Sequence, residues 1–159
     1  MNINIYKEYA ARISQASSTE LVIISYELII TKLEEAEYKF HNGSHDEFVF
    51  SLHKAQQTLT HMMNSLNFEY KISYDLLSLY LYINKKIANS VCKLDPKALE
   101  NSISILMKLK SGFEGIKDKD RFGSVMDNTQ QIYAGLTYRK DKLIEVNTDF
   151  ENLSRGYTI

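Results

Sequence analysis

The chain has 159 residues, of which 44% are hydrophobic and 25% are charged, and its formal net charge is −1. This length predicts one domain with a sizeable core, and the near-neutral charge argues against the basic surface that meets nucleic acid or acidic membranes. The single cysteine, Cys92, excludes an internal disulfide and is typical of the reducing cytosol. We expect no secretory signal, because the N-terminus lacks a basic start followed by an apolar core. We also expect no membrane span, because no apolar run reaches the roughly 20 residues that cross a bilayer.

Residues 1–15 carry a weak helical pattern, in which Tyr6, Tyr9 and Ile13 fall on one face. A helix this short is not stable alone in water, so we expect it to dock on another element. Two interpretations are open. It is either a permanent N-terminal arm on its own core or a movable lid over a binding groove.

The first long helix is predicted from about Ser18 to His41. Ser17 precedes it and Glu20 follows three residues later, which is the spacing of a capping box. Its core stripe repeats at four-three spacing through Val22, Tyr26, Ile29, Leu33, Ala36 and Phe40. A second, shorter apolar stripe consists of Leu21, Ile24 and Leu28. The helix is therefore expected to bury more than one face.

The second long helix is predicted from Ser44 to about Leu66, after Gly43 ends the first in the left-handed conformation. Ser44 and Glu47 again have capping-box spacing. The core stripe of this helix consists of Phe48, Leu52, Ala55, Leu59, Met62 and Leu66. The amphipathic pattern predicts one buried face and a polar remainder.

The third helix is predicted from about Ser73 to Leu94, with a core stripe of Leu76, Tyr80, Ile83, Ile87 and Leu94. A second face of this helix is also apolar, and it consists of Tyr74, Leu77, Leu81 and Ala88. An ordinary surface helix is polar on that side.

Asp95 and Pro96 predict the start of a fourth helix, with the aspartate as N-cap and the proline at the first helical position. Its apolar residues are Leu99, Ile103, Leu106 and Phe113, and it is expected to end around residues 112–115. Residues 118–159 change in character. We predict a charged linker, one short helix at 124–134, and a partly ordered remainder.

Four long helices with short connections predict an all-α fold, an antiparallel up-and-down four-helix bundle with a short N-terminal helical arm. The bundle domain is assigned to residues 1–117 and the C-terminal extension to 118–159. The first and third helices carry more apolar surface than a four-helix core needs. Such a surplus marks a protein interface when exposed, unless the arm and the extension cover it permanently.

Few residues suggest metal or catalytic chemistry. No glutamate has a histidine three residues later, as di-iron bundles require. His53 and His61 share one helix but lie about 12 Å apart along its axis, so we interpret them as partly buried structural histidines. Cys92 is interpreted as a small apolar filler. We expect no cofactor, no metal and no catalytic residue.

Several short motifs follow one another in a particular order between Tyr6 and Ile116. They are the arm tyrosines Tyr6 and Tyr9, Glu20-Leu21 and Tyr26-Glu27 on the first helix, Lys54-Ala55-Gln56 and Asn64-Ser65-Leu66 on the second, Leu79-Tyr80-x-Tyr82-Ile83-x-Lys85-Lys86-Ile87 and Ala88-Asn89 on the third, and Asp95 before the fourth. In this order and spacing the chain resembles the FliS family of flagellar secretion chaperones. The tail after Lys117 exceeds the usual family length.

The resemblance implies a cytoplasmic, non-enzymatic chaperone that holds the disordered C-terminal segment of flagellin, prevents premature polymerisation and aids secretion. The implied partners are flagellin and the flagellar export apparatus, without nucleic acid and without membrane insertion. A disordered client that folds as amphipathic helices needs an extended apolar groove. Two alternatives remain open, a histidine phosphotransfer bundle that uses His53 or His61 and a generic helix-binding adaptor.

We predict the flagellin groove on the second apolar face of the third helix, at Tyr74, Leu77, Leu81 and Ala88. Tyr6, Tyr9 and Ile13 of the arm are expected to rest on or beside this groove when it is empty. Core packing is the alternative for Leu77 and Leu81. A second hypothesis places a client-like helix of the extension in the groove, through Val125, Met126, Thr129, Ile132 and Tyr133.

Overall fold

The structure is a computed structural model that describes residues 3–119 and Val125, with only the backbone described for residues 3–7. Contacts within the chain separate residues 1–127 from residues 128–159, and the account below concerns the first of these units. The short helix predicted at 124–134, and with it the client-like residues Met126, Thr129, Ile132 and Tyr133, lies outside the described residues apart from Val125.

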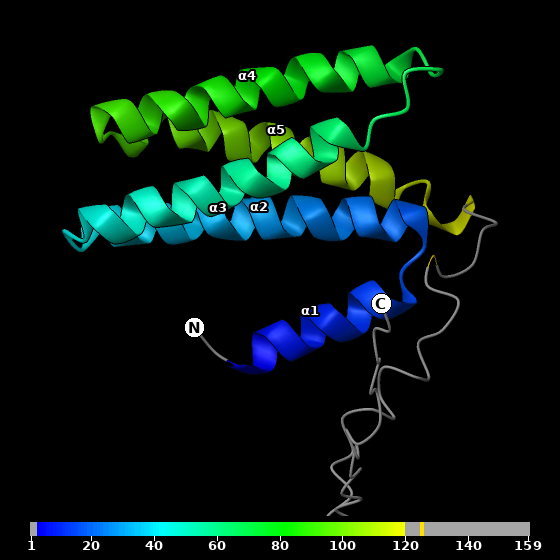
Figure 1. The fold of residues 1–159 in the computed structure, drawn as a ribbon, viewed down its shortest axis with the longest axis horizontal. Coiled ribbons are helices and arrows are strands. Elements are labelled where there is room, and N and C mark those ends of the chain that lie inside the picture. The colour runs from blue at the N-terminus through cyan, green and yellow to red at the C-terminus, as the bar shows by residue number, and fades with distance from the viewer. Residues whose placement is uncertain (1–2, 120–124, 126–159) are drawn as a thin grey trace, which may run out of the picture. The chain divides into compact units, whose positions relative to one another are not determined.

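The described residues form five α-helices and two short 3₁₀ helices, with no strand among them. They are α1 (Ile3–Gln15), α2 (Ser18–His41), α3 (His45–Asn64), α4 (Ile72–Lys93), η1 (Pro96–Ala98), α5 (Leu99–Glu114) and η2 (Lys117–Lys119). From α2 to α5 each helix reverses the direction of the one before it (Figure 1). The predicted all-α helical bundle is confirmed. Within the described part of the chain, no helix has the length and apolarity needed to cross a membrane.

The arrangement of the bundle makes α2 and α4 diagonal partners. Helix α2 packs against α3 and α5, and α4 packs against the same two helices. Across the diagonal, the hydroxyls of Tyr26 and Tyr80 are 2.5 Å apart in a buried hydrogen bond. The two tyrosines therefore join the halves of the core at its centre.

The start of α2 and the turn after it follow the predicted capping chemistry. The Ser17 hydroxyl accepts a hydrogen bond from the Glu20 backbone N–H at 3.3 Å, and the Glu20 carboxylate accepts one from the Ser17 N–H at 3.1 Å. Gly43 has a φ of 76°, the left-handed conformation that glycine adopts without strain. Both predictions are confirmed.

The capping box predicted at Ser44 is wrong. The Ser44 side chain makes no cap hydrogen bond to α3, and the Glu47 carboxylate is instead paired with Lys39 of α2. A lysine on the neighbouring helix thus takes the carboxylate that the box would have used.

The predicted core stripes are largely confirmed. The buried cluster consists of Tyr26, Ile29, Ile30, Leu33, Ala36, Phe48, Leu52, Ala55, Leu59, Met62, Tyr80, Ile83, Ile87, Leu99 and Leu106. Leu94 was predicted to belong to it and does not, because it is 45% exposed and has a φ of 49° where the chain leaves α4. Cys92 is also exposed, so its interpretation as a core filler is wrong.

Helix α1 runs along α2 on the side of that helix away from α4 (Figure 1). Ile23 and Ile24 of α2 are buried although they do not belong to the cluster shared by the four bundle helices. Ala16, at the junction of α1 and α2, is buried with them. Part of the surplus apolar surface of α2 therefore lies next to α1.

Candidate functional site

The outer face of α4 presents apolar side chains to solvent. Tyr74 and Leu81 are 57% and 52% exposed, whereas Leu77 and Ala88 are half-buried. The opposite face of the same helix is in the core through residues such as Tyr80 and Ile83. From residue 74 to residue 88 this outer face extends over about 21 Å of helix, at 1.5 Å per residue. It is long enough to contact about four turns of a partner helix.

Three further exposed apolar side chains lie at the start of α4 and in the connection before it. Phe68, Tyr70 and Ile72 are exposed, and the ring of Phe68 lies 5.3 Å from that of Tyr74. A hydrogen bond stabilises the connection between α3 and α4, in which the Ser73 hydroxyl donates to the Asn67 carbonyl at 2.5 Å. Because the helices are predicted to end near Leu66 and to begin again near Ser73, residues 67–72 were expected only to connect them. The unusual number of aromatic residues in it was the signal available.

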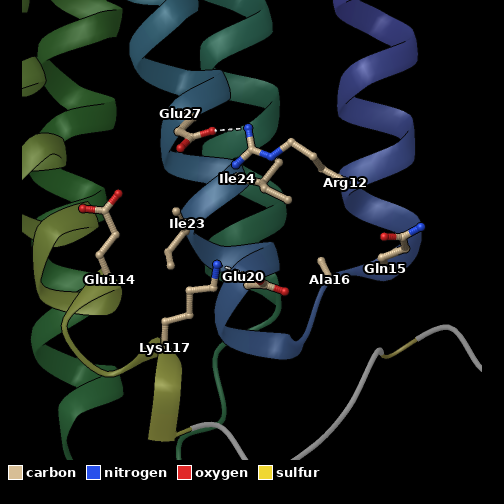
Figure 2. A pocket seen from close by; sticks show the side chains of 9 residues that line it. All are labelled: Arg12, Gln15, Ala16, Glu20, Ile23, Ile24, Glu27, Glu114 and Lys117. Carbon is tan, nitrogen blue, oxygen red and sulfur yellow. Dashed lines mark hydrogen bonds and ion pairs between the residues drawn. The ribbon is translucent and has the colours of Figure 1, made fainter.

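A pocket of about 330 Å³ opens between α1, α2 and the end of α5. Figure 2 shows Ile23 and Ile24 on its α2 wall, with polar side chains around them. Those polar lining residues are Arg12, Gln15, Glu20, Glu27, Glu114 and Lys117. A second pocket of about 370 Å³ lies nearby and is lined by Tyr9 of α1, Ile30 of α2 and Met107 of α5. Helix α1 thus covers α2 without filling the space between them.

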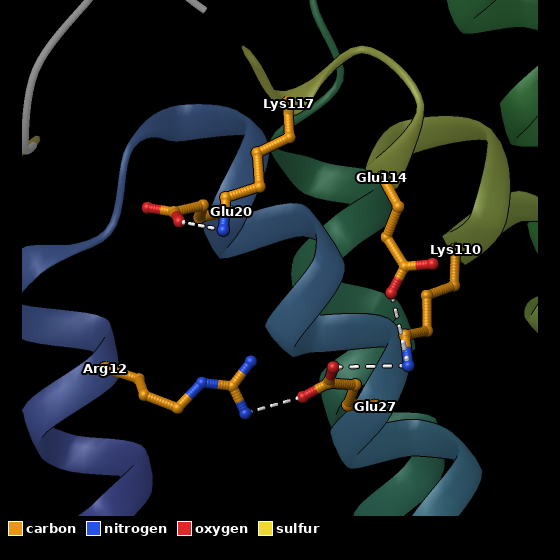
Figure 3. Close-up of polar contacts among 6 residues, drawn as sticks. All are labelled: Arg12, Glu20, Glu27, Lys110, Glu114 and Lys117. Atoms are coloured by element: carbon orange, nitrogen blue, oxygen red, sulfur yellow. Dashed lines mark hydrogen bonds and ion pairs between the residues drawn. The ribbon is translucent and has the colours of Figure 1, made fainter.

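A chain of ion pairs crosses from α1 through α2 to α5 (Figure 3). Arg12 Nη1 lies 2.8 Å from Glu27 Oε2, and Lys110 Nζ lies 3.3 Å from Glu27 Oε1. Lys110 also approaches Glu114 Oε1 at 3.5 Å. Separately, Lys117 Nζ lies 2.7 Å from Glu20 Oε1. The first three contacts link α1 through α2 to the C-terminal part of α5, and the fourth links η2 to the start of α2.

The ion pairs change the pKa values of Glu20 and Glu27. The hydrogen bond from Lys117, with a second from the Ser17 backbone, lowers the pKa of Glu20. Partial burial alone would raise the pKa of Glu27, but hydrogen bonds from Arg12 and Lys110 outweigh it and the net pKa is lowered. Both carboxylates are consequently charged at neutral pH.

The predicted groove residues fall on two surfaces. Tyr74, Leu77, Leu81 and Ala88 share the outer face of α4. Tyr6, Tyr9 and Ile13 belong to α1, which lies on the other side of α2 (Figure 1). The structure therefore does not bring the arm and the α4 face together. The assignment of either set to a client remains a prediction.

The two candidate histidines are exposed on α3, so their interpretation as partly buried residues is wrong. His53 Nδ1 lies 3.3 Å from Gln56 Oε1 on its own helix. Across residues 3–119, no three histidine, cysteine or acidic side chains gather in a geometry suited to a metal ion.

The chain matches the family model described as flagellar protein FliS over residues 2–120. This range contains both candidate surfaces, α1 with its pocket and the outer face of α4. None of the curated proteins compared with the chain matches it.

Proposed function

Because the chain belongs to the FliS family of flagellar proteins, whose members are chaperones of flagellum biogenesis rather than enzymes, we propose that it is an export chaperone for flagellin. It holds the disordered C-terminal segment of flagellin in the cytoplasm and prevents premature polymerisation. It then presents the subunit to the flagellar export apparatus. This role requires binding surface and no cofactor.

The observation that carries this proposal is the apolar outer face of α4. Tyr74 and Leu81 are more than half exposed on a helix whose other face is already in the core. Exposed apolar side chains gathered on one helix face are typical of a protein-binding site. An amphipathic client helix would bury its own apolar stripe there, and that burial would offset the cost of ordering the client, which is about 2–5 kcal/mol.

The face of α2 next to α1 is a second surface for the same client. Ile23 and Ile24 are apolar, and α1 leaves open pockets beside them. A client helix that displaced α1 would gain these side chains. In this role α1 is the movable lid, and Tyr9 and Ile13 are residues that the client replaces.

Isothermal titration calorimetry tests the proposal with the full chain and a peptide of the C-terminal segment of the host's flagellin. We expect saturable binding with a negative heat-capacity change, because apolar surface is buried. Absence of heat and of any retained peptide in a pull-down would contradict the proposed client. Incorporation of acid-labile phosphate at His53 or His61 by a cognate kinase would instead favour the phosphotransfer alternative.

The double substitution Leu77→Asp and Leu81→Asp tests the site. We expect the affinity for the peptide to fall at least tenfold, since two charges would be buried beneath the client helix. The matched control is Gln57→Asp with Thr60→Asp, which adds the same charges at exposed positions of α3 and should leave binding unchanged. Circular dichroism shows whether each variant keeps the helical content of the wild type. Unfolding of the leucine variant would mean that its leucines support the core, and unchanged affinity would remove them from the site.

A further inference from the structure

Two contacts connect the chain beyond α5 to the junction between α1 and α2. Lys117 Nζ lies 2.7 Å from Glu20 Oε1, and the Val125 backbone N–H donates to the Ala16 carbonyl at 3.1 Å. The side chain of Val125 is 54% exposed, so this contact uses its backbone alone. Residues from the C-terminal side of the bundle therefore meet the point about which α1 would swing.

The junction is short and its polar groups are shared. Only Ala16 and Ser17 separate α1 from α2. Glu20 uses one carboxylate oxygen to cap α2 through the Ser17 N–H and the other to pair with Lys117. The Ala16 carbonyl accepts the hydrogen bond from Val125. The groups that fix the direction of the chain between the helices are thus also the groups that the C-terminal side contacts.

Polar contacts are prominent where the C-terminal half of α1 faces α2. The pocket of about 330 Å³ beneath its C-terminal half is lined by five charged side chains and only a few apolar ones. Farther along the helix, Arg12 is held by Glu27, which Lys110 of α5 also contacts (Figure 3). An open interface of this kind has few dispersion contacts, so the loss of individual polar contacts should change how often α1 opens.

We propose that Lys117 and Val125 form a strap that fastens α1 over α2. Glu20 and Ala16 lie outside α1, so the strap acts on the junction about which α1 turns. An opening of α1 that moves this junction would break the Lys117–Glu20 ion pair and the Val125–Ala16 hydrogen bond. The fastening of α1 is independent of the client. Its consequence, that the strap controls entry of the flagellin segment beneath α1, rests on the proposed function.

Hydrogen–deuterium exchange of the full-length protein tests the strap. The variants are Lys117→Met, which removes the ion pair, and Val125→Pro, which removes the backbone donor. Lys119→Met is the matched control, because Lys119 is in the same 3₁₀ helix and makes no ion pair with another described residue. We expect α1 amides to exchange roughly 3- to 10-fold faster in the double variant. The amides of α3 should not change.

Two results would overturn the strap. One is α1 exchange in the double variant equal to that of the wild type. The other is faster exchange of α1 and α3 by the same factor, which would indicate loss of global stability instead of local release.

Titration with the flagellin peptide tests the consequence separately. If the client enters beneath α1, the double variant should bind it several-fold more tightly, because less free energy is needed to open α1. If α1 exchanges faster in the double variant but the affinity for the peptide is unchanged, the strap does not control entry of the client. The proposal that the strap restrains α1 would still stand. Absence of binding by the wild type would contradict the proposed function and leave the exchange result unaffected.

Discussion

The paired hydroxyls of Tyr26 and Tyr80 are the most specific polar contact in the core. Burial, followed by the hydrogen bond to Tyr80, raises the pKa of Tyr26, and burial likewise raises the pKa of Tyr80. The pair therefore stays neutral over the physiological range. Because the two residues are 54 positions apart on diagonal helices, the bond also fixes how α2 and α4 face each other.

Tyr26→Phe is expected to lower the free energy of unfolding by about 1–3 kcal/mol, because the Tyr80 hydroxyl stays buried without its partner. The combined Tyr26→Phe and Tyr80→Phe variant should cost less than the sum of the single changes, since it leaves neither hydroxyl unpaired. Urea denaturation of the four proteins measures the coupling. Strictly additive effects would show that the bond contributes nothing specific.

The attachment of α1 to α2 should depend on pH. The pKa values of Glu20 and Glu27 are lower in the folded protein than the ordinary value of 4.5. The ion pair between Arg12 and Glu27 thus stabilises the attachment of α1, and the ion pair between Lys117 and Glu20 stabilises the start of α2. Both contributions are complete above about pH 4.5 and are lost as the pH falls through the lowered pKa values.

We expect amide cross-peaks of α1 in two-dimensional NMR spectra to shift or broaden between pH 5 and pH 3, before those of α3 change. The Glu27→Gln variant provides the control, because one titrating carboxylate is removed and the response of α1 should weaken. A response of the same size in wild type and variant would exclude Glu27 as a contributor. Simultaneous changes in α1 and α3 would indicate general acid unfolding.

The helices were largely predictable from the sequence because their signals are local. Ser17 with Glu20 marked the start of α2, and the four-three stripes identified the core faces. The local signal failed at Ser44, where Lys39 of another helix competes for Glu47. It failed again at Leu94, where the path of the chain out of α4 decides exposure.

The candidate site was less predictable, because it depends on which helices become neighbours. Periodicity showed that α4 has a second apolar face but not whether a neighbour covers Leu77 and Leu81. It also gave no means of placing Tyr9 and Ile13 beside α2 and away from α4. The ion pairs of Glu27 join three helices that are distant in sequence, and no spacing rule anticipates them.

The C-terminal extension carries two separate hypotheses: that it occupies the groove, and that Val125 belongs to the strap. One deletion and one substitution distinguish them. Deletion of residues 124–159 removes the Val125 contact and also any client-like segment. We expect the deletion to tighten flagellin binding. Calorimetry of the deletion variant and of Val125→Pro compares how much affinity each of the two changes adds. A larger gain for the deletion would support occupation of the groove by residues 126–159. Equal gains would assign the whole effect to the strap, and weaker binding by the deletion would count against both.

The position of α1 and the outer face of α4 on opposite sides of α2 sets a requirement on the cargo. One continuous straight helix cannot contact both surfaces. A client that contacts both must therefore wrap around the bundle as two amphipathic helices joined by a non-helical spacer. Crossing about two helix diameters, roughly 20 Å, takes at least about six extended residues. Flagellin peptides whose spacer is shortened below that length should lose the avidity that two tethered stretches provide.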